Sequence, residues 1–158
     1  MMAKKQLVIV ESPTKARTIN KILGSEFDVT SSMGHLRDLP ASRLGVDVEH
    51  DFEPHYITIY KRRKFAKQLQ QHARGRSTVY LAPDPDREGE AISWHLAKLL
   101  EEDEAAEAKK RAKRAAKKPT GKPSKRRKAS KSKVALQDGR KIYRITFHEI
   151  TPEAVKAA

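Results

Sequence analysis

The strongest constraint on the fold of this chain is a short apolar run that stops abruptly in an acidic turn. Residues 79–82 (Val-Tyr-Leu-Ala) are followed by two prolines and, within residues 84–90, by four carboxylates. Apolar residues at helical spacing then run over 91–100. A strand, an acidic turn and a helix in this order place the acids at the carboxyl edge of an α/β sheet, where ligands bind.

The prolines of this turn, Pro83 and Pro85, hold the acids close together. Each proline fixes its own φ and pushes the preceding residue towards extended conformations, so Asp84, Asp86 and Glu88 cannot easily separate. Clustered carboxylates favour a bound cation, and oxygen ligands suit Mg²⁺. For an isolated Asp-x-Asp, a solvated turn at a helix start is the better interpretation; the rest of the chain changes that balance.

A second acid follows the first predicted strand, residues 6–10, whose continuous apolar run is typical of a strand covered on both faces. Glu11 comes next, and Ser12 and Pro13 then predict a helix cap and a first helical residue. That helix carries Lys15 in its first turn and stops at Gly24.

The remaining pattern repeats strands and helices in alternation. This order predicts an α/β fold with a mostly parallel, doubly wound sheet flanked by helices. Further strands or extended segments are predicted at 27–31, 56–60, 78–82 and 141–147, a loop at 33–40, a helix at 65–73, and a short helix after Thr151.

The excess of positive charge is confined to one segment of the chain. The 158 residues carry a net charge of +14, and residues 109–133 hold 14 Lys and Arg with no acid, so the rest of the chain is neutral. We expect a discontinuous domain, 1–100 and 140–158, around a charged insertion, 101–139, that is largely disordered. Residues 109–116 are also compatible with an extension of the preceding helix. The insertion could add salt-sensitive attraction to DNA.

The composition narrows the class of protein. The length suits one α/β domain. The absence of cysteine excludes disulfides, thiolate metal sites and a cysteine nucleophile. The sequence has no membrane-length apolar run and no signal-peptide pattern, which predicts a cytoplasmic protein without a membrane partner.

Acids thus follow two predicted strands of one parallel sheet: Glu11 after the first, and Asp84, Asp86 and Glu88 after a later one. If these strands are neighbours, three or four carboxylates converge on one metal-sized space. Lys15 and the adjacent helix start add positive potential. Carboxylates with Mg²⁺ beside a cationic helix end suit chemistry on phosphodiesters.

Five blocks of the sequence resemble, in the same order, the Toprim domain of bacterial type IA DNA topoisomerases. They are residues 8–16 (Val-Ile-Val-Glu-Ser-Pro-Thr-Lys-Ala), 34–40 (Gly-His-Leu-Arg-Asp-Leu-Pro), 84–92 (Asp-Pro-Asp-Arg-Glu-Gly-Glu-Ala-Ile), 94–96 (Trp-His-Leu) and 144–151 (Arg-Ile-Thr-Phe-His-Glu-Ile-Thr). The resemblance implies a Rossmann-like Toprim fold. It also implies an isomerase that uses Mg²⁺ to cut and rejoin single-stranded DNA through a 5′-phosphotyrosine, changing DNA topology by relaxing negative supercoils.

The resemblance also implies roles for individual residues. Asp84 and Asp86 would hold Mg²⁺ with help from Glu88, while Glu11 would lie near the scissile phosphate, contact the metal and exchange a proton with the 3′-hydroxyl. Lys15 would stabilise the phosphate charge. DNA contacts are implied for Lys15, His35 and Arg37.

Plainer interpretations remain open for several of these positions. Lys15 is also compatible with a solvated helix lysine, and His35 with an ordinary loop histidine. Arg87 and Glu90 are expected to be structural. Trp94 is expected in the core, and His95 is expected to pack or to face solvent.

None of the tyrosines stands in a segment that resembles the nucleophile's motif, since Tyr56, Tyr60, Tyr80 and Tyr143 all lie in strand-like patterns. We therefore expect an N-terminal piece that lacks the tyrosine-bearing domain, binds Mg²⁺ and is inactive alone. Its partners would be single-stranded DNA and the remaining topoisomerase domains, at the nucleoid. The alternatives are another Toprim enzyme (a primase or a small metal-dependent nuclease) or a non-catalytic nucleic-acid-binding module.

Overall fold

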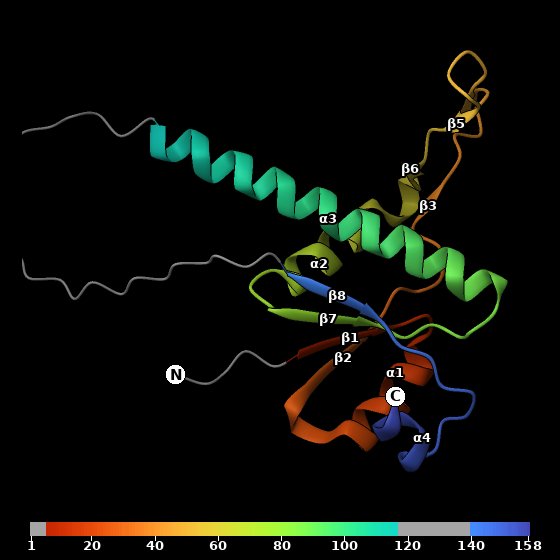
Figure 1. The fold of residues 1–158 in the computed structure, drawn as a ribbon, viewed down its shortest axis with the longest axis vertical. Helices are drawn as coiled ribbons and strands as arrows, with labels where there is room; N and C mark the ends of the chain where they lie inside the picture. The colour runs from red at the N-terminus through yellow and green to blue at the C-terminus, as the bar shows by residue number, and fades with distance from the viewer. Residues whose placement is uncertain (1–5, 117–139) are drawn as a thin grey trace, which may run out of the picture.

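A parallel sheet with helices on both faces forms the centre of the computed structural model, which describes residues 6–116 and 140–158 (Figure 1). The elements along the chain are β1 (Gln6–Val10), α1 (Pro13–Leu23), η1 (Gly24–Glu26), β2 (Phe27–Ser31), β3 (Arg37–Asp38), β4 (Val46–Asp47), β5 (Glu53–Pro54), β6 (Ile57–Thr58), η2 (Tyr60–Arg62), α2 (Arg63–Ala73), β7 (Thr78–Leu81), α3 (Arg87–Ala116), β8 (Lys141–Arg144) and α4 (Pro152–Ala157), where η denotes a 3₁₀ turn.

The sheet has the strand order β2-β1-β7-β8, and every pairing in it is parallel. All four strands therefore end at the same edge. In the register of the central pair, Ile9 lies opposite Leu81, so the residues that follow β1 and β7 meet at that edge. The predicted α/β fold with a mostly parallel sheet flanked by helices is confirmed.

The central strand β1 is buried on both faces because its side chains alternate between two cores. Leu7 and Ile9 pack into a cluster with residues of α2 and α3, whereas Val8 and Val10 pack into a cluster with residues of α1 and α4. This burial on both faces explains why the sequence of β1 is a continuous apolar run.

The helix after β1 begins and ends where the sequence predicts. The Ser12 side chain accepts a hydrogen bond from the Lys15 backbone N–H, and Pro13 is the first helical residue. Gly24 follows the last turn with φ of 69°, a value that glycine adopts without a steric penalty. These two caps fix where Lys15 lies relative to the sheet edge.

An arm, residues 37–58, projects from the sheet beside the first half of α3 (Figure 1). Two short antiparallel pairs build it: β3 with β6 at its base, and β4 with β5 further out. Near its tip, Asp51 and Phe52 adopt positive φ, and Phe52 is exposed. The strand or extended segment predicted at 56–60 shrinks to Ile57–Thr58, because Tyr60 starts a 3₁₀ turn that leads into α2.

The long helix α3 differs from the predicted boundary at residue 100. It continues to Ala116, so residues 101–116 are helical and not disordered, and the alternative that 109–116 extend the preceding helix agrees with the structure. Asp103 explains part of this order, since it is buried and accepts two hydrogen bonds from the guanidinium of Arg74, the residue that follows α2. The remainder of the predicted insertion, 117–139, lies outside the described residues.

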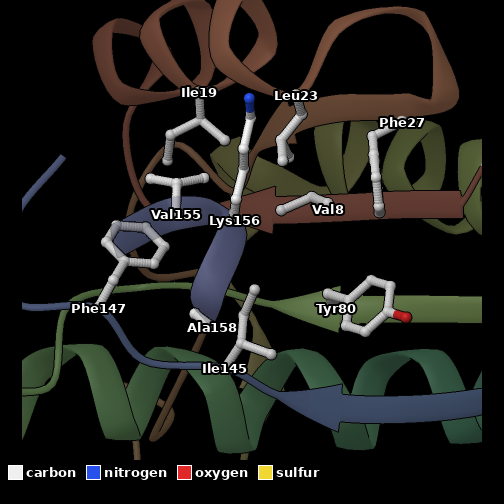
Figure 2. A pocket seen from close by; sticks show the side chains of 10 residues that line it. All are labelled: Val8, Ile19, Leu23, Phe27, Tyr80, Ile145, Phe147, Val155, Lys156 and Ala158. Carbon is white, nitrogen blue, oxygen red and sulfur yellow. The ribbon is translucent and has the colours of Figure 1, made fainter. Parts of the chain in front are cut away.

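The last strand is also shorter than predicted. β8 ends at Arg144 instead of continuing to residue 147. The backbone N–H of Ile145 still donates to Leu81, after which Phe147 turns into the core under α1 and α4. That side of the sheet holds an apolar cavity of about 250 Å³, lined by residues of α1, β1, β2, β7, the segment after β8, and the C-terminal end with α4 (Figure 2). Within residues 6–116 and 140–158, no helix is long and apolar enough to cross a membrane.

Candidate functional site

Two acids from neighbouring strands come together at the carboxyl edge of the sheet. Glu11 follows β1, and Asp84 follows β7 after the two buried residues Ala82 and Pro83. The Lys15 ammonium forms ion pairs with both carboxylates. The sequence-based expectation that these strands are neighbours is therefore confirmed by the strand order, and Glu11 and Asp84 face one shared cation.

The cation at this point is Lys15, which α1 carries one turn after Glu11. Its side chain is 24% exposed, against 19% for Glu11 and 45% for Asp84. Partial burial lowers the pKa of Lys15, but the hydrogen bonds to Asp84 and Glu11 outweigh it, so its pKa lies above the ordinary value. The ammonium therefore stays charged throughout the physiological range.

Asp86 caps the start of α3 instead of facing Lys15. Its Oδ1 accepts a hydrogen bond of 2.6 Å from the backbone N–H of Gly89. Gly89 is itself buried, and a side chain there would collide with the backbone of Asp84. The turn from Asp84 to Gly89 is thus tightly folded, which places both aspartates at the beginning of one helix.

The fourth predicted ligand, Glu88, contacts the predicted DNA-binding histidine. Its Oε1 lies 3.3 Å from Nε2 of His35, and both side chains are exposed, at 72% and 41%. His35 belongs to the loop after β2, where Gly34 adopts φ of 82° and donates its N–H to the Glu11 carbonyl. The loop therefore connects the Glu11 edge of the site with the start of α3.

Arg37, also predicted to contact DNA, is tied into the protein. Its guanidinium pairs with Glu102 of α3 at 2.8 Å and donates to the carbonyl of Tyr56, and its side chain is 12% exposed. These contacts hold the base of the arm against α3. Arg37 therefore has a structural role, and its contact with DNA stays a prediction.

Arg144, at the end of β8, positions the acidic turn and was not predicted from the sequence. Its guanidinium donates to the backbone carbonyls of Leu81, Asp84 and Ile145, and it pairs with Glu90 at 2.6 Å. The expectation that Glu90 is structural agrees with this pairing. No signal in the sequence pointed to this position, because the last strand was predicted to continue to residue 147, whereas β8 ends at Arg144 and so brings it to the same sheet edge.

The donor set suits a hard cation in its chemistry. Glu11 and Asp84 supply carboxylate oxygens, and Oε2 of Glu11 is buried with no hydrogen-bond partner in the described part of the chain. The hydroxyl of Ser32, which follows β2 beside Glu11, is likewise buried and unpartnered there. Asp86 and Glu88 face Gly89 and His35, however, and among residues 6–116 and 140–158 no three acids or histidines gather as a metal cluster.

The interpretation of Trp94 as a core residue is wrong. Its side chain is half exposed, while the neighbours Ile92 and Leu96 on α3 take the buried positions. Trp94 sits instead against Tyr56 of the arm and His95. His95 was expected either to pack or to face solvent. It packs against the rings of Tyr56 and Trp94.

A parallel sheet with carboxylates at the ends of two adjacent strands and a lysine between them defines the class: an α/β domain with a charged site at the carboxyl edge of its sheet. The model of the Toprim domain family matches residues 6–117. The chain belongs to the Toprim domain family.

A solved structure supports the same assignment. The chain resembles full-length topoisomerase I from Thermotoga maritima, solved in a monoclinic crystal form, with 35% sequence identity and a TM-score of 0.65. The match covers 96% of this chain and 20% of the topoisomerase chain. The chain therefore spans about a fifth of the length of the solved topoisomerase that it matches.

Proposed function

We propose that this chain is the Toprim region of a type IA DNA topoisomerase, which supports the Mg²⁺-dependent cutting and rejoining of single-stranded DNA. The observation that carries the proposal is the meeting of Glu11 and Asp84, from adjacent parallel strands, at the ammonium of Lys15. The likeness to a topoisomerase I over 96% of the chain supports it.

In this proposal Asp84 and Asp86 hold Mg²⁺, with Glu11 and Glu88 as further oxygen ligands. Glu11, Asp84 and Asp86 lie in the loops that leave the carboxyl ends of β1 and β7, and Glu88 lies in the first turn of α3. The bound ion would neutralise phosphate charge and orient the reacting hydroxyl. The unpartnered Oε2 of Glu11 supports this assignment, because a buried carboxylate oxygen favours a partner.

Glu11 and Lys15 are the residues that act on the scissile phosphate. Lys15 carries its proton at neutral pH, as a lysine does unless its pKa is strongly lowered, and here the pKa is raised; it can therefore stabilise negative charge that develops on the phosphate. Glu11 is proposed to exchange a proton with the 3′-hydroxyl. Lys15 contacts the strand as well, together with His35 and Arg37.

The tyrosine nucleophile is proposed to lie in another domain of the same enzyme. The remaining topoisomerase domains and single-stranded DNA are thus the partners, and the enzyme would act in the cytoplasm at the nucleoid. Incubation of the purified chain with negatively supercoiled plasmid and Mg²⁺ should leave the plasmid supercoiled. Relaxation would overturn the predicted inactivity, and nicking of single strands without a protein adduct would favour a Toprim nuclease instead.

The metal assignment is tested by Mg²⁺ titration followed by calorimetry and by thermal unfolding. The wild type should bind Mg²⁺ and gain thermal stability, whereas Asp84→Asn/Asp86→Asn should lose both effects. Glu26→Gln is the matched control, because this exposed acid precedes β2 at the opposite edge of the sheet. Identical titrations of all three proteins would point to a binding module whose acids only stabilise loops.

A further inference from the structure

Trp94 presents a large aromatic surface to solvent beside the proposed site. Its residue surface is 50% exposed, although it lies on α3 only six residues after Glu88. At about 1.5 Å of helix rise per residue, this separation is about 9 Å along the axis. A stacked strand advances about 3.4 Å per nucleotide, so Trp94 is within a few nucleotides of the acidic turn.

Two neighbours fix the orientation of the indole. The ring centroids of Trp94 and Tyr56 are 5.5 Å apart and those of Trp94 and His95 are 4.9 Å apart, both in T-shaped arrangements. Tyr56 and His95 also contact each other, at 4.5 Å. Three mutually packed rings make a rigid platform, which loses little conformational entropy when a ligand binds.

The platform is continuous with the proposed site along the seam between α3 and the arm. Glu88, His95 and Glu102 are spaced seven residues apart on α3, and thus lie on one face of the helix. They contact His35, Tyr56 and Arg37, respectively. The seam therefore runs from the acidic turn past the aromatic rings, and Figure 1 shows the base of the arm above this half of α3.

The exposed positions of α3 on either side of Trp94 are charged. Arg87 and Glu90 precede it, and Lys98 follows it one turn later. A single aromatic ring set among charged side chains lacks the broad apolar centre of a protein–protein interface. It does suit a nucleotide, whose base stacks on the ring while its phosphate meets cations such as Arg87.

We propose that Trp94, supported by Tyr56 and His95, is a stacking site for an unpaired base of the single strand that occupies the acidic edge. The inference rests on the proposed function and adds a binding site for the nucleobase to a site that otherwise contacts phosphate and metal. Stacking on an aromatic ring tolerates every base, so the site contributes affinity without sequence preference.

Trp94 is the only tryptophan in the chain, which allows a direct optical test. Intrinsic fluorescence is recorded while the chain is titrated with an oligothymidylate and with an abasic oligonucleotide of equal length, at one fixed salt concentration. Anisotropy of a labelled copy of each oligonucleotide gives the affinity independently. We expect the base-bearing strand to quench Trp94 and the abasic strand to leave its emission unchanged.

Two variants separate stacking from folding. Trp94→Ala should bind the base-bearing strand about 5- to 100-fold more weakly, with no change towards the abasic strand. Trp94→Phe keeps a ring and should stay within about threefold of the wild type. Circular dichroism confirms that both variants fold.

Three outcomes overturn the inference. Binding by anisotropy without quenching, and with unchanged affinity of Trp94→Ala, would leave the proposed function intact and assign the exposed ring to a protein contact. Equal losses of Trp94→Ala towards both oligonucleotides would show a structural role. Failure of both oligonucleotides to bind the wild type would remove the stacking site, and the Mg²⁺ titration of the aspartate variants would then decide the proposed function by itself.

Discussion

A Cβ atom on Gly89 would lie 2.9 Å from the carbonyl carbon of Asp84 and would overlap its carbonyl oxygen. Gly89 is in the first turn of α3, and Asp84 is the acid that shares Lys15 with Glu11. Because Gly89 has no side chain, the start of α3 packs directly on the backbone of Asp84. The acidic turn owes its tight geometry to this contact.

Gly89→Ala should therefore displace the turn. The better helix propensity of alanine offsets part of the cost, and we expect a net destabilisation of about 1–3 kcal/mol from overpacking against backbone. Urea unfolding measures this loss, and calorimetry should show weaker Mg²⁺ binding because Asp84 moves. Arg87→Ala, on an exposed position of the same turn, is the control and should change stability by at most about 0.5 kcal/mol. Wild-type stability of Gly89→Ala would contradict the packing argument.

Arg144 holds the same turn from the neighbouring strand. Arg144→Met removes the donor for the Asp84 carbonyl, whereas the Leu81 carbonyl keeps the N–H of Ile145. We expect a loss of about 1–3 kcal/mol because the partly buried carbonyl of Asp84 is left unpaired. Arg144→Lys should not restore stability, since one ammonium cannot reproduce the fork of the guanidinium. Glu90→Gln removes only an exposed charge pair and should cost less than about 1 kcal/mol. Equal losses in urea for Arg144→Met and Glu90→Gln would show that the carbonyl contacts contribute little.

Local signals were enough to predict the elements that build the site. One helix is delimited by Ser12, Pro13 and Gly24, which lie at its own ends. The apolar run of β1 is by itself typical of a buried strand. Both features could therefore be interpreted without the rest of the fold. The meeting of Glu11 with Asp84 also follows from topology, because parallel strands end at one edge.

Contacts between distant segments could not be predicted in this way. Helical spacing alone places Trp94 near the apolar stripe of α3, but the arm packs along that side through Tyr56 and leaves the indole half exposed. The ion pair between Arg37 and Glu102 likewise depends on how the arm packs against α3. The helical state of 101–116 depends in part on the contact between Asp103 and Arg74, which lies just after the end of α2.

Removing Arg74 should lower the free energy of unfolding more than removing its partner Asp103. Asp103 is 5% exposed and accepts two hydrogen bonds from Arg74, which is itself 41% exposed. Arg74→Ala leaves a buried carboxylate without its cation and should cost about 3 kcal/mol or more. Asp103→Ala leaves a guanidinium that water can solvate, and should cost about 1–2 kcal/mol.

The double variant sharpens this test. Arg74→Ala/Asp103→Ala should be more stable in urea than Arg74→Ala alone, because no unpaired charge remains buried. Circular dichroism at 222 nm should show a loss of helix in Arg74→Ala, from the part of α3 beyond residue 100. Equal losses in both single variants, with additive behaviour in the double variant, would show that water reaches Asp103.

His95 should make the stability of the domain depend on pH near neutrality. Burial lowers the pKa of His95, and the nearby Arg37 and His35 act in the same direction, against a smaller opposite effect of Asp38. The unfolded chain, with an ordinary histidine pKa of about 6.5, then binds a proton that the folded chain does not. Stability is therefore fully present above about pH 6.5 and falls as the pH decreases towards the folded pKa of His95, by at most about 1.4 kcal/mol per pH unit.

Comparison of variants assigns this slope to one residue. Urea unfolding at pH 7.5 and pH 5.5 should show a smaller loss for His95→Gln than for the wild type, whatever the absolute stability of the variant. His148→Gln is the comparison variant, because His148 is an exposed histidine in the segment after β8. If His95→Gln loses as much stability as the wild type over this interval, another group carries the pH dependence and His95 accepts its proton in the folded domain.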